Sequence, residues 1–343
     1  MSGPHWPRDL EPGQSFGEGA PEKAPSRNGV APERGSEPPW RGARPLRRDE
    51  VYSRPVVDGR ELRDNFLTRL HHRVRLLSRS RAEQQELELE RRLHEVPGVS
   101  RPNIVSVISP KGGVGKTTAT FLLGDLLSSH LRLKTIVVDA NPDFGTLSRL
   151  APERIRAEPT LAELVGNMER MRSGSELRSF VSCVPSGLHL LGAPAHPEVM
   201  AEMGPETYDR VVSFLSQFYD VVVLDCGTGI TDPLARFAVE RADQIVVVAT
   251  PEWMTADTVL GALRHLSLER ATLVLNRAGA GPGDRRAIES SFARQRLSNR
   301  TIIPYDEQLA TMLDSGTYAL GRLRRHVRLP IKELGLAVGE QLV

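Results

Sequence analysis

The sequence predicts a three-layer α/β sandwich, in which helices cover both faces of a mostly parallel sheet. From about residue 102 onward, short apolar runs alternate with helical patterns, and this alternation is typical of parallel sheets. The apolar runs are 104–108, 135–138, 188–191, 221–224, 244–248 and 272–275. Helical patterns lie at about 117–130, 206–218, 254–267 and 284–296. A second observation agrees, because polar motifs follow the ends of these runs, where such sheets bind ligands.

Composition sets broad limits on size and location. The chain has 343 residues, which is enough for one large or two small domains. Its formal net charge is only +2, so the total charge indicates no particular partner. Its two cysteines, Cys183 and Cys226, cannot form a disulfide framework. That usage is typical of a reducing cytosol, so we expect a cytoplasmic protein. We also expect no membrane span and no secretory signal, since no long apolar run occurs.

The first 58 residues have the composition of a disordered tail. They contain ten of the 25 prolines and seven of the 29 glycines, while apolar residues are sparse. Such a segment cannot bury enough apolar surface to offset its conformational entropy. We therefore expect residues 1–58 to be a disordered Pro/Gly-rich tail.

Residues 59–98 are expected to form a basic amphipathic helical segment. Apolar side chains recur there at helical spacing, at Leu62, Phe66, Leu70, Val74 and Leu77. Seven arginines between positions 60 and 81 surround them. A basic helix of this kind can lie on an anionic membrane surface, bind a partner, or pack on the main domain with a solvated face. The pattern does not choose among these, and the main domain is predicted to cover residues 102–343.

Residues 103–118 combine a strand, a glycine loop and a helix start, which is the order that a phosphate site needs. Glycines lack Cβ atoms, so successive backbone N–H groups can curl around an anion. Lys116 would place a positive charge near the β- and γ-phosphates, and Thr117 would offer its hydroxyl to Mg²⁺. We therefore expect the nucleotide to contact Gly112, Gly113, Val114, Gly115, Lys116, Thr117 and Thr118.

The loop departs from the usual G-x-x-x-x-G-K-[ST] pattern, because Pro110 stands where the first glycine is expected. A second lysine, Lys111, stands at the loop entrance instead. This arrangement resembles the deviant P-loop of the ParA/MinD family of dimeric ATPases. The resemblance implies a P-loop NTPase fold, binding of ATP and Mg²⁺, and an ATP-bound homodimer in which Lys111 reaches the nucleotide of the other subunit. A plain surface lysine is the alternative.

The strand at 135–138 ends in Asp139, which is placed to hold a Mg²⁺-bound water or to orient the attacking water. The ParA/MinD pattern here is usually Asp-x-Asp, and the second acid, which positions the hydrolytic water in the family, is Asn141 in this chain. Asparagine keeps the shape without the charge, so we expect slow hydrolysis. Asp143 is a candidate substitute, and both aspartates have turn capping as an alternative. We assign Asp139 to the catalytic set, with Lys111 and Lys116.

The run at 221–224 leads into Asp225, which is the pattern of a Walker-B-like strand. We expect Asp225 to bind Mg²⁺ through a water. An aspartate after a strand often only caps the turn, but the glycine loop and Asp139 favour the metal role here. The predicted metal set is therefore Thr117, Asp139 and Asp225.

Two later segments are candidates for reading the base. Asn276 closes the run at 272–275, and the matching asparagine of the ParA/MinD family hydrogen-bonds adenine, so the resemblance implies that Asn276 reads the base. A turn asparagine is the alternative. Residues 302–306 resemble the Ile-Pro-x-Asp segment that runs beside the base in the family, which places Pro304 in the nucleotide site. Residues 250–252 resemble the family's Thr/Asn-Pro-Glu turn.

These features together predict an ATP-dependent dimerising switch ATPase of the ParA/MinD type. Such a protein positions or partitions a cargo, which is a chromosome, a septum component or secretion machinery, and an activating protein partner reads the ATP-bound dimer. The alternative function is an ATP-binding scaffold with little or no hydrolysis, which Asn141 favours. The motifs around Asp139 and Asp225 also resemble actinobacterial family members, several of which accompany type VII secretion systems and carry a Pro-rich tail.

A basic run near the C-terminal end raises the question of a surface partner. It comprises Arg322, Arg324, Arg325 and Arg328, just before a helix expected at about residues 330–342. In ParA proteins, surface basic residues of this kind bind DNA phosphates without sequence preference. A solvated basic face is the alternative. We therefore expect a cytoplasmic protein with a possible peripheral location at a nucleoid or an anionic membrane.

Overall fold

The computed structural model describes most of the residues from Ser80 onward, and they belong to one compact unit. The described residues are 80–141, 145–194, 196–229, 232–252, 258–259, 261, 271–279, 290, 297 and 299–342. The predicted tail at 1–58, the arginine-rich stretch at 59–79 and Asp143 lie outside them. Most of the helices expected at 254–267 and 284–296 lie outside them as well.

An eight-stranded sheet forms the centre of the unit, with the strand order β3-β4-β2-β5-β1-β6-β7-β8. Every pairing is parallel except the one between β3 and β4. The strands are β1 Asn103–Ser109, β2 Thr135–Ala140, β3 Ser182–Cys183, β4 His189–Leu191, β5 Val221–Thr228, β6 Gln244–Ala249, β7 Ala271–Ala278 and β8 Asn299–Pro304. The six predicted strands and the mostly parallel sheet are confirmed.

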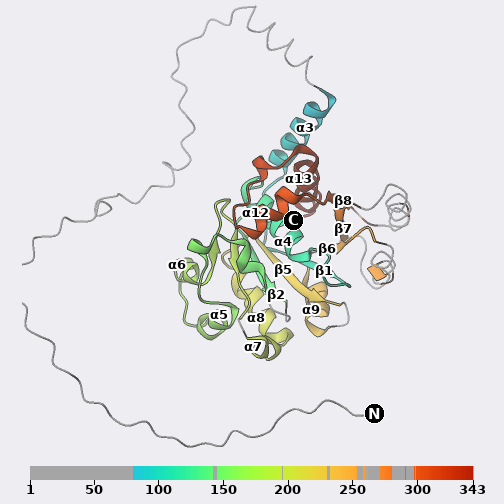
Figure 1. Cartoon of the computed structure of the whole chain (residues 1–343). Helices are drawn as coiled ribbons and strands as arrows, with labels where there is room; N and C mark the ends of the chain where they lie inside the picture. Colours follow the sequence, from blue (N-terminus) through green and yellow to red (C-terminus); the bar gives the residue numbers. More distant parts are fainter. Residues whose placement is uncertain are drawn as a thin grey trace, which may run out of the picture. The chain divides into compact units, whose positions relative to one another are not determined.

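Helices cover both faces of this sheet (Figure 1), so the predicted three-layer sandwich is also confirmed. Helices α4, α12 and α13 lie on one face, with α3 packed on the outside of α13, and helices α5, α7, α8 and α9 lie on the other. Their bounds are α3 Arg81–Glu95, α4 Lys116–Ser129, α5 Leu161–Asn167, α6 Gly174–Leu177, α7 Pro197–Ala201, α8 Pro205–Leu215, α9 Pro233–Arg241, α12 Glu307–Asp314 and α13 Arg325–Gly339.

Four short 3₁₀ turns complete the described elements. They are η1 Leu147–Leu150, η2 Glu153–Ile155, η3 Arg178–Phe180 and η5 Leu320–Arg322. Among the described helices, none is both long enough and apolar enough to cross a bilayer.

The two-residue period of the central strands divides the core into two clusters. Along β1, Val105 and Val107 pack with α4 and α13, whereas Ile104 and Ile108 pack with α8 and α9 on the other face. Because both faces of the strand are covered, the whole strand is buried and reads as an apolar run. The same burial explains why the central strands could be recognised from the sequence.

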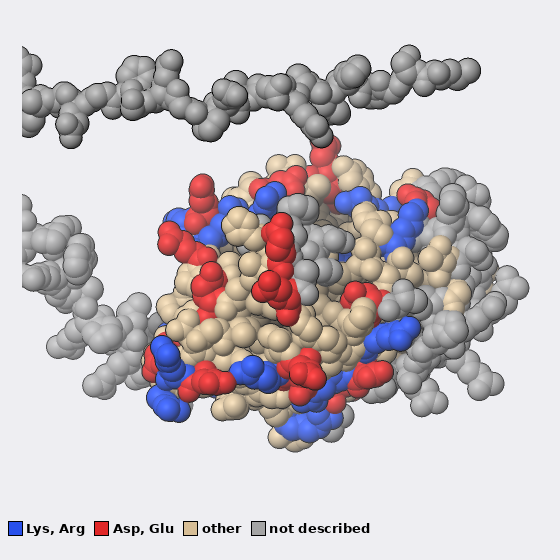
Figure 2. Space-filling model, turned by 90° about the horizontal axis from the view of Figure 1, so that it is seen from below, with Lys and Arg blue, Asp and Glu red and all other residues tan. Residues whose placement is uncertain are grey.

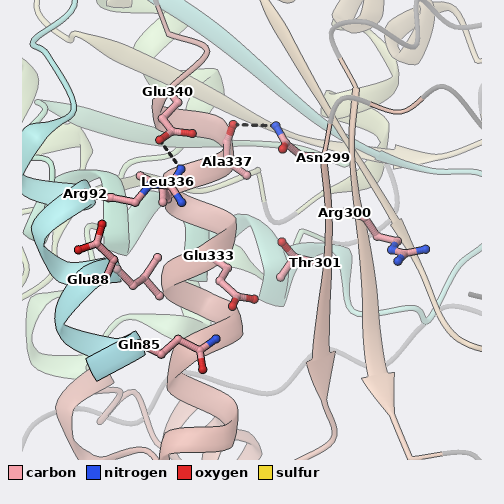
Figure 3. A pocket seen from close by; sticks show the side chains of 11 residues that line it. Gln85, Glu88, Arg92, Asn299, Arg300, Thr301, Glu333, Leu336, Ala337 and Glu340 are labelled. Atoms are coloured by element: carbon pink, nitrogen blue, oxygen red, sulfur yellow. Dashed lines mark hydrogen bonds and ion pairs between the residues drawn. The ribbon is translucent and has the colours of Figure 1, made fainter. Parts of the chain in front are cut away.

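Helix α3 packs against α13 through two buried leucines, Leu89 and Leu93. A capping box starts the helix, because the Ser80 hydroxyl accepts a hydrogen bond from the Glu83 N–H and the Glu83 carboxylate accepts one from the Ser80 N–H. Near the helix end, Arg92 forms an ion pair of 2.7 Å with Glu340, the residue that follows α13 (Figure 3). The described part of the expected 59–98 segment is thus a helix packed on the domain.

Helix α13 begins five residues earlier than expected and contains Pro330 in its interior. Proline is favoured in the first turn of a helix and disfavoured in its interior, so a start near Pro330 would have been the ordinary arrangement. The apolar face decides the boundary instead, since Val327, Ile331 and Leu334 are all fully buried against the sheet side of the core. As a result, Arg325 and Arg328 belong to the helix rather than to a run before it.

Candidate nucleotide-binding site

The glycine loop joins the end of β1 to the start of α4, as the motif predicts. Gly113 and Gly115 have positive φ angles of 75° and 82°, a backbone conformation that side chains with a Cβ rarely adopt. Gly115 is also the N-cap of α4, and no side chain caps this end of the helix. The N–H groups of the first turn therefore remain available to an anion, and the helix dipole favours negative charge there.

Lys116 is buried at the start of α4, and its ammonium group lies 3.3 Å from Oδ1 of Asp225. The hydroxyl of Thr120 lies 3.1 Å from the same oxygen. The other oxygen, Oδ2 of Asp225, is buried and has no hydrogen-bond partner among the residues that the structure describes. A buried carboxylate oxygen with no partner is costly, and it is an oxygen that a hydrated cation can satisfy.

Asp139 lies beside Asp225, because β2 and β5 are paired in register at these two residues. Its carboxylate accepts hydrogen bonds from the N–H groups of Leu147 and Asn141, at 3.1 and 3.3 Å. Burial, with the neighbouring Asp225 charge as the second cause, raises the pKa of Asp139 to about 7. Two adjacent buried carboxylates disfavour joint ionisation unless a cation is present, so these residues fit the predicted Mg²⁺.

The backbone approaches Asp139 closely at Gly145. A Cβ at position 145 would overlap Oδ2 of Asp139 and would lie 2.5 Å from the Cβ of Ala193. The chain just before η1 therefore needs glycine at position 145. Asn141 itself is half-buried at the start of that loop, while Asp143 lies outside the described residues.

The two threonines of the motif lie on the first turn of α4, where Thr117 and Thr118 are both half-buried. The structure places Thr117 directly after Lys116 and within the same helix turn as the predicted phosphate site. Thr120 was not expected to contribute. Its contact with Asp225 follows from helix geometry, since residues four apart lie on one face and Lys116 also contacts Asp225.

Asn276 at the end of β7 supports the glycine loop from behind. It is 4% exposed, and its side-chain amide donates a hydrogen bond of 2.9 Å to the Val114 carbonyl. A Cβ at position 115, in place of the hydrogen of Gly115, would overlap the same amide nitrogen. The predicted role in reading adenine stays a prediction, because this donor is occupied by the loop. Pro304 ends β8 beside Ala278, two residues beyond Asn276.

Arg277 also contacts the glycine loop, which the sequence did not predict. Its backbone has a positive φ of 55°, uncommon for a residue with a long side chain. Its guanidinium donates a hydrogen bond of 3.2 Å to the Gly113 carbonyl. Strained backbone tends to persist where surrounding structure enforces it, often at functional sites. Only the position of Arg277 directly after Asn276 could have indicated this contact from the sequence.

Lys111 lies at the exposed entrance of the loop. Its ammonium group is 3.6 Å from a carboxylate oxygen of Glu252, on the turn after β6. Both side chains are largely exposed, at 44% and 67%. They line an open cavity of about 310 Å³ together with Gly112, Gly113, Val114, Thr250, Pro251 and Arg277.

The arrangement defines a nucleotide-binding protein of the P-loop class: a glycine loop and a helix start at the end of a central parallel strand, with two carboxylates on neighbouring strand ends. A sequence profile described as an AAA domain matches residues 102–270. The ESX-1 secretion-associated protein EspI of Mycobacterium tuberculosis is 27% identical over 238 residues, which cover 66% of this chain and 35% of EspI. The septum site-determining protein MinD of Thermotoga maritima is 30% identical over 181 residues, which cover 51% of this chain and 64% of MinD.

Solved structures share the fold. A ParA family ATPase from Chlorobium tepidum superposes with a TM-score of 0.58 at 23% identity, covering 69% of this chain and 98% of that one. MinD of Pyrococcus horikoshii, complexed with Mg-ADP, gives 0.54 at 21% identity, covering 68% and 94%. In its motif, its fold and these relatives, the chain is similar to P-loop ATPases of the ParA/MinD type. It spans about a third of EspI and under two thirds of MinD.

Proposed function

We propose that this chain binds ATP with Mg²⁺ and acts as a switch between a monomer and an ATP-bound homodimer. The observation that carries the proposal is the buried group formed by Lys116, Asp225 and Asp139 at the end of the glycine loop. In this group, the Lys116 ammonium is paired with the Asp225 carboxylate, and the Asp139 carboxylate lies alongside. Among the described residues, Oδ2 of Asp225 has no partner. Such a group is poised to exchange partners when phosphates and a metal ion arrive.

Each of these residues has a distinct task in nucleotide binding. The N–H groups of the loop and of the first turn of α4 hold the phosphate oxygens. Lys116 turns from Asp225 toward the β- and γ-phosphates, which exchanges one anionic partner for another. Asp225, once released by Lys116, would hold a hydrated Mg²⁺ together with Asp139 and the Thr117 hydroxyl. When bound, Mg²⁺ neutralises charge that develops on the phosphate oxygens.

Hydrolysis by this chain is proposed to be slow. We assign a role in orienting the attacking water to Asp139, whose carboxylate accepts two backbone hydrogen bonds. Asn141, at the next alternate position, is an amide that can orient a water but carries no charge. A partner that supplies the missing group would accelerate turnover, as added groups do for slow nucleotide hydrolases.

Dimerisation is proposed to depend on Lys111. The side chain is exposed at the loop entrance and rests against the largely exposed Glu252. Ion pairs between exposed side chains are worth only about 0–1 kcal/mol, so this contact does not prevent Lys111 from leaving. In the ATP-bound dimer, Lys111 of each subunit would contact the nucleotide of the other.

Two lysine variants test these steps separately. Lys116→Ala should lose ATP binding in calorimetry, because the buried charge that faces the phosphates is gone. Lys111→Ala should bind ATP but stay monomeric in light scattering with ATP and Mg²⁺. Lys134→Ala, an exposed lysine at the opposite end of the sheet, is the matched control and should behave as the wild type. Unchanged ATP affinity in Lys116→Ala contradicts the nucleotide site, and an ATP-dependent dimer of Lys111→Ala contradicts the bridging role.

A second candidate is a scaffold that holds ATP and hardly hydrolyses it, placed within a secretion assembly. Asn141 favours this alternative, and so does the similarity to EspI, whose name associates it with ESX-1 secretion. Single-turnover hydrolysis separates the candidates. A bound ATP that is released unchanged favours the scaffold, whereas conversion to ADP on the enzyme favours the switch.

DNA as the surface partner has less support than the sequence suggested. Two of the four arginines in the basic run, Arg325 and Arg328, pair with Glu86 of α3 at 3.2 and 2.7 Å. Only Arg322 and Arg324 of the four remain exposed. The face drawn in Figure 2 interleaves basic and acidic side chains, whereas DNA-binding surfaces gather basic ones. A peripheral location at a nucleoid or membrane therefore stays a proposal for the residues at 59–79.

A further inference from the structure

A cavity of about 300 Å³ lies on the outer side of α4, away from the glycine loop. Its walls come from α4, from η1 and the residue just before η2, from the turn between β3 and β4, and from the segment that joins α12 to η5. The residues used below are Phe121, Asp125, His130, Leu150, Ser186 and Tyr318. The nucleotide site described above uses none of them.

One carboxylate dominates the polar character of this cavity. Asp125 is 7% exposed, and the side chain of Ser186 is its hydrogen-bond partner. Burial, the larger effect, raises the pKa of Asp125 to about 6, so at neutral pH the carboxylate is mostly ionised although it is nearly removed from water. Burial also lowers the pKa of His130 in the same wall, which keeps that imidazole neutral. No lysine or arginine lies among the described residues that line the cavity, so the negative charge has no cationic partner within it.

A second buried group in the wall lacks a partner. The hydroxyl of Tyr318 is buried and makes no hydrogen bond within the described part of the chain. Its ring meets the ring of Phe121 edge to face, with centroids 5.4 Å apart. Burial raises the pKa of the Tyr318 phenol, and the nearby Asp125 charge raises it further, so the hydroxyl stays protonated at neutral pH. Buried hydroxyls usually have partners, and one without a partner marks a place where a ligand or an ordered water completes the site.

The chemistry of the wall selects the class of ligand. An isolated buried carboxylate attracts a cation, aromatic rings stabilise a cation further, and apolar side chains such as Leu150 accommodate a short alkyl chain. A volume near 300 Å³ is at the lower end for ligand pockets, so the occupant is small. We propose that this cavity is a second ligand site, which binds an alkylammonium group through Asp125 and Tyr318. The group belongs either to a free amine or to a lysine side chain of a protein segment.

The direct test is a titration of the full chain with n-butylammonium chloride at about pH 7.5, followed by ligand-observed NMR and calorimetry. We expect a Kd on the order of 1 mM, since small ligands gain limited free energy per atom. Asp125→Asn should weaken binding by about tenfold or more, because the amide keeps the shape and removes the charge. Tyr318→Phe, which keeps the ring and removes only the hydroxyl, should weaken binding by a few fold. Glu153→Gln, an exposed acid on η2 that does not line the cavity, is the matched control and should bind as the wild type does.

Neutral and peptide probes complete the experiment. Butanol has the same length without the charge and should bind at least about tenfold more weakly. Equal binding of butanol, unchanged binding by Asp125→Asn, or no binding by the wild type each overturns the proposal. If Asp125→Asn fails to fold, the Tyr318→Phe variant and the butanol comparison still decide. Tighter binding of Nα-acetyl-lysine methylamide than of butylammonium assigns the ligand to a protein side chain, and the opposite order assigns it to a free amine.

Discussion

At the scale of single residues, the identity of Asn141 bears most directly on the rate of ATP hydrolysis. Water-positioning and general-base groups contribute roughly 10²–10⁴-fold to rate. Restoring an acid with Asn141→Asp should therefore raise the turnover of ATP while leaving its affinity nearly unchanged. Hydrolysis by both forms at saturating ATP and Mg²⁺ is the measurement. A wild type that is already the faster enzyme would mean that Asp139 or Asp143 orients the water.

Gly115 offers a test of the loop geometry. Its positive φ excludes a larger residue, and so does the overlap that a Cβ would make with the Asn276 amide. Gly115→Ala should lower ATP affinity by at least about tenfold, because the loop must shift to relieve the contact. Gly98→Ala is the control, since a Cβ there meets nothing within 4 Å. Calorimetric titration with ATP compares the two, and equal affinities would show that the loop tolerates the shift.

Asp125 predicts a defined pH dependence of stability. Its pKa rises from an ordinary 3.8 to about 6 on folding, so the folded state binds more protons between these values. The free energy of unfolding therefore falls as pH rises through this window, by roughly 3 kcal/mol for a shift of about two units. Asp125→Asn removes this dependence, so urea unfolding at about pH 4 and pH 7.5 should show the variant gaining stability relative to the wild type at the higher pH. A stability difference between variant and wild type that is the same at both pH values would contradict the raised pKa of Asp125.

The site could be predicted from the sequence where spacing alone defines it. Lys116, Asp139 and Asp225 follow from a motif and from strand ends, and the structure brings them together. The contacts of Arg277 and Asn276 with the glycine loop could not be predicted, because they depend on where β7 lies relative to β1. The contact of Thr120 required knowing that Lys116, on the same face of α4, contacts Asp225. The partner of a polar side chain is a property of the fold, whereas the motif specifies only the loop.

At the scale of elements, the contact between α3 and α13 centres on an ionic cluster. Lys332 is 3% exposed and lies 2.6 Å from Glu90 and 3.3 Å from Glu86, which also pairs with Arg328. The sequence predicted a helical segment over residues 59–98, and α3 is its described part, but the place where α3 packs could not be predicted. The basic residues of α13 looked like a surface for an external anion, and much of that charge is matched within the chain.

Removing Glu86 should loosen this contact. Glu86→Gln removes the negative charge that pairs with Arg325, Arg328 and the buried Lys332. We therefore expect the free energy of unfolding to fall by about 1–3 kcal/mol. The matched control is Glu88→Gln, because Glu88 pairs with Arg91 where both side chains are more than half exposed. Such exposed pairs contribute about 0–1 kcal/mol. Urea unfolding separates the two, and equal losses would mean that the buried lysine is satisfied by Glu90 alone.

At the scale of the whole molecule, the sequence predicted the layers better than the order of the strands. The alternation of apolar runs and helices is a local pattern, and it predicted the mostly parallel sheet correctly. The order β3-β4-β2-β5-β1-β6-β7-β8 depends on crossovers between distant segments, which no local pattern encodes. Strand β3 has two residues and β8 is at the sheet edge with a partly exposed pattern, so neither produced a clear apolar run.

Nucleotide and metal should stabilise the whole domain by separable amounts. A ligand that binds only the folded state raises the free energy of unfolding by about 2.7 kcal/mol when its concentration is 100 times its Kd. An increase of this size raises the Tm of such a domain by several degrees. The wild type should gain one increment from ATP and a further one from Mg²⁺. Asp225→Asn should keep much of the first increment, since Lys116 and the loop remain, and lose the second, since the metal has lost its carboxylate.

The measurement is the Tm of each form by calorimetry, with ATP and EDTA and then with ATP and Mg²⁺. Asp209→Asn is the control, because Asp209 is an exposed acid that pairs with Arg241 away from the loop. Apo Asp225→Asn should itself be less stable than the wild type, since Lys116 stays buried without its anionic partner. A full Mg²⁺ increment in Asp225→Asn would place the metal on Asp139 and Thr117 alone. The unpartnered oxygen of Asp225 would then have a structural explanation rather than a metal-binding one.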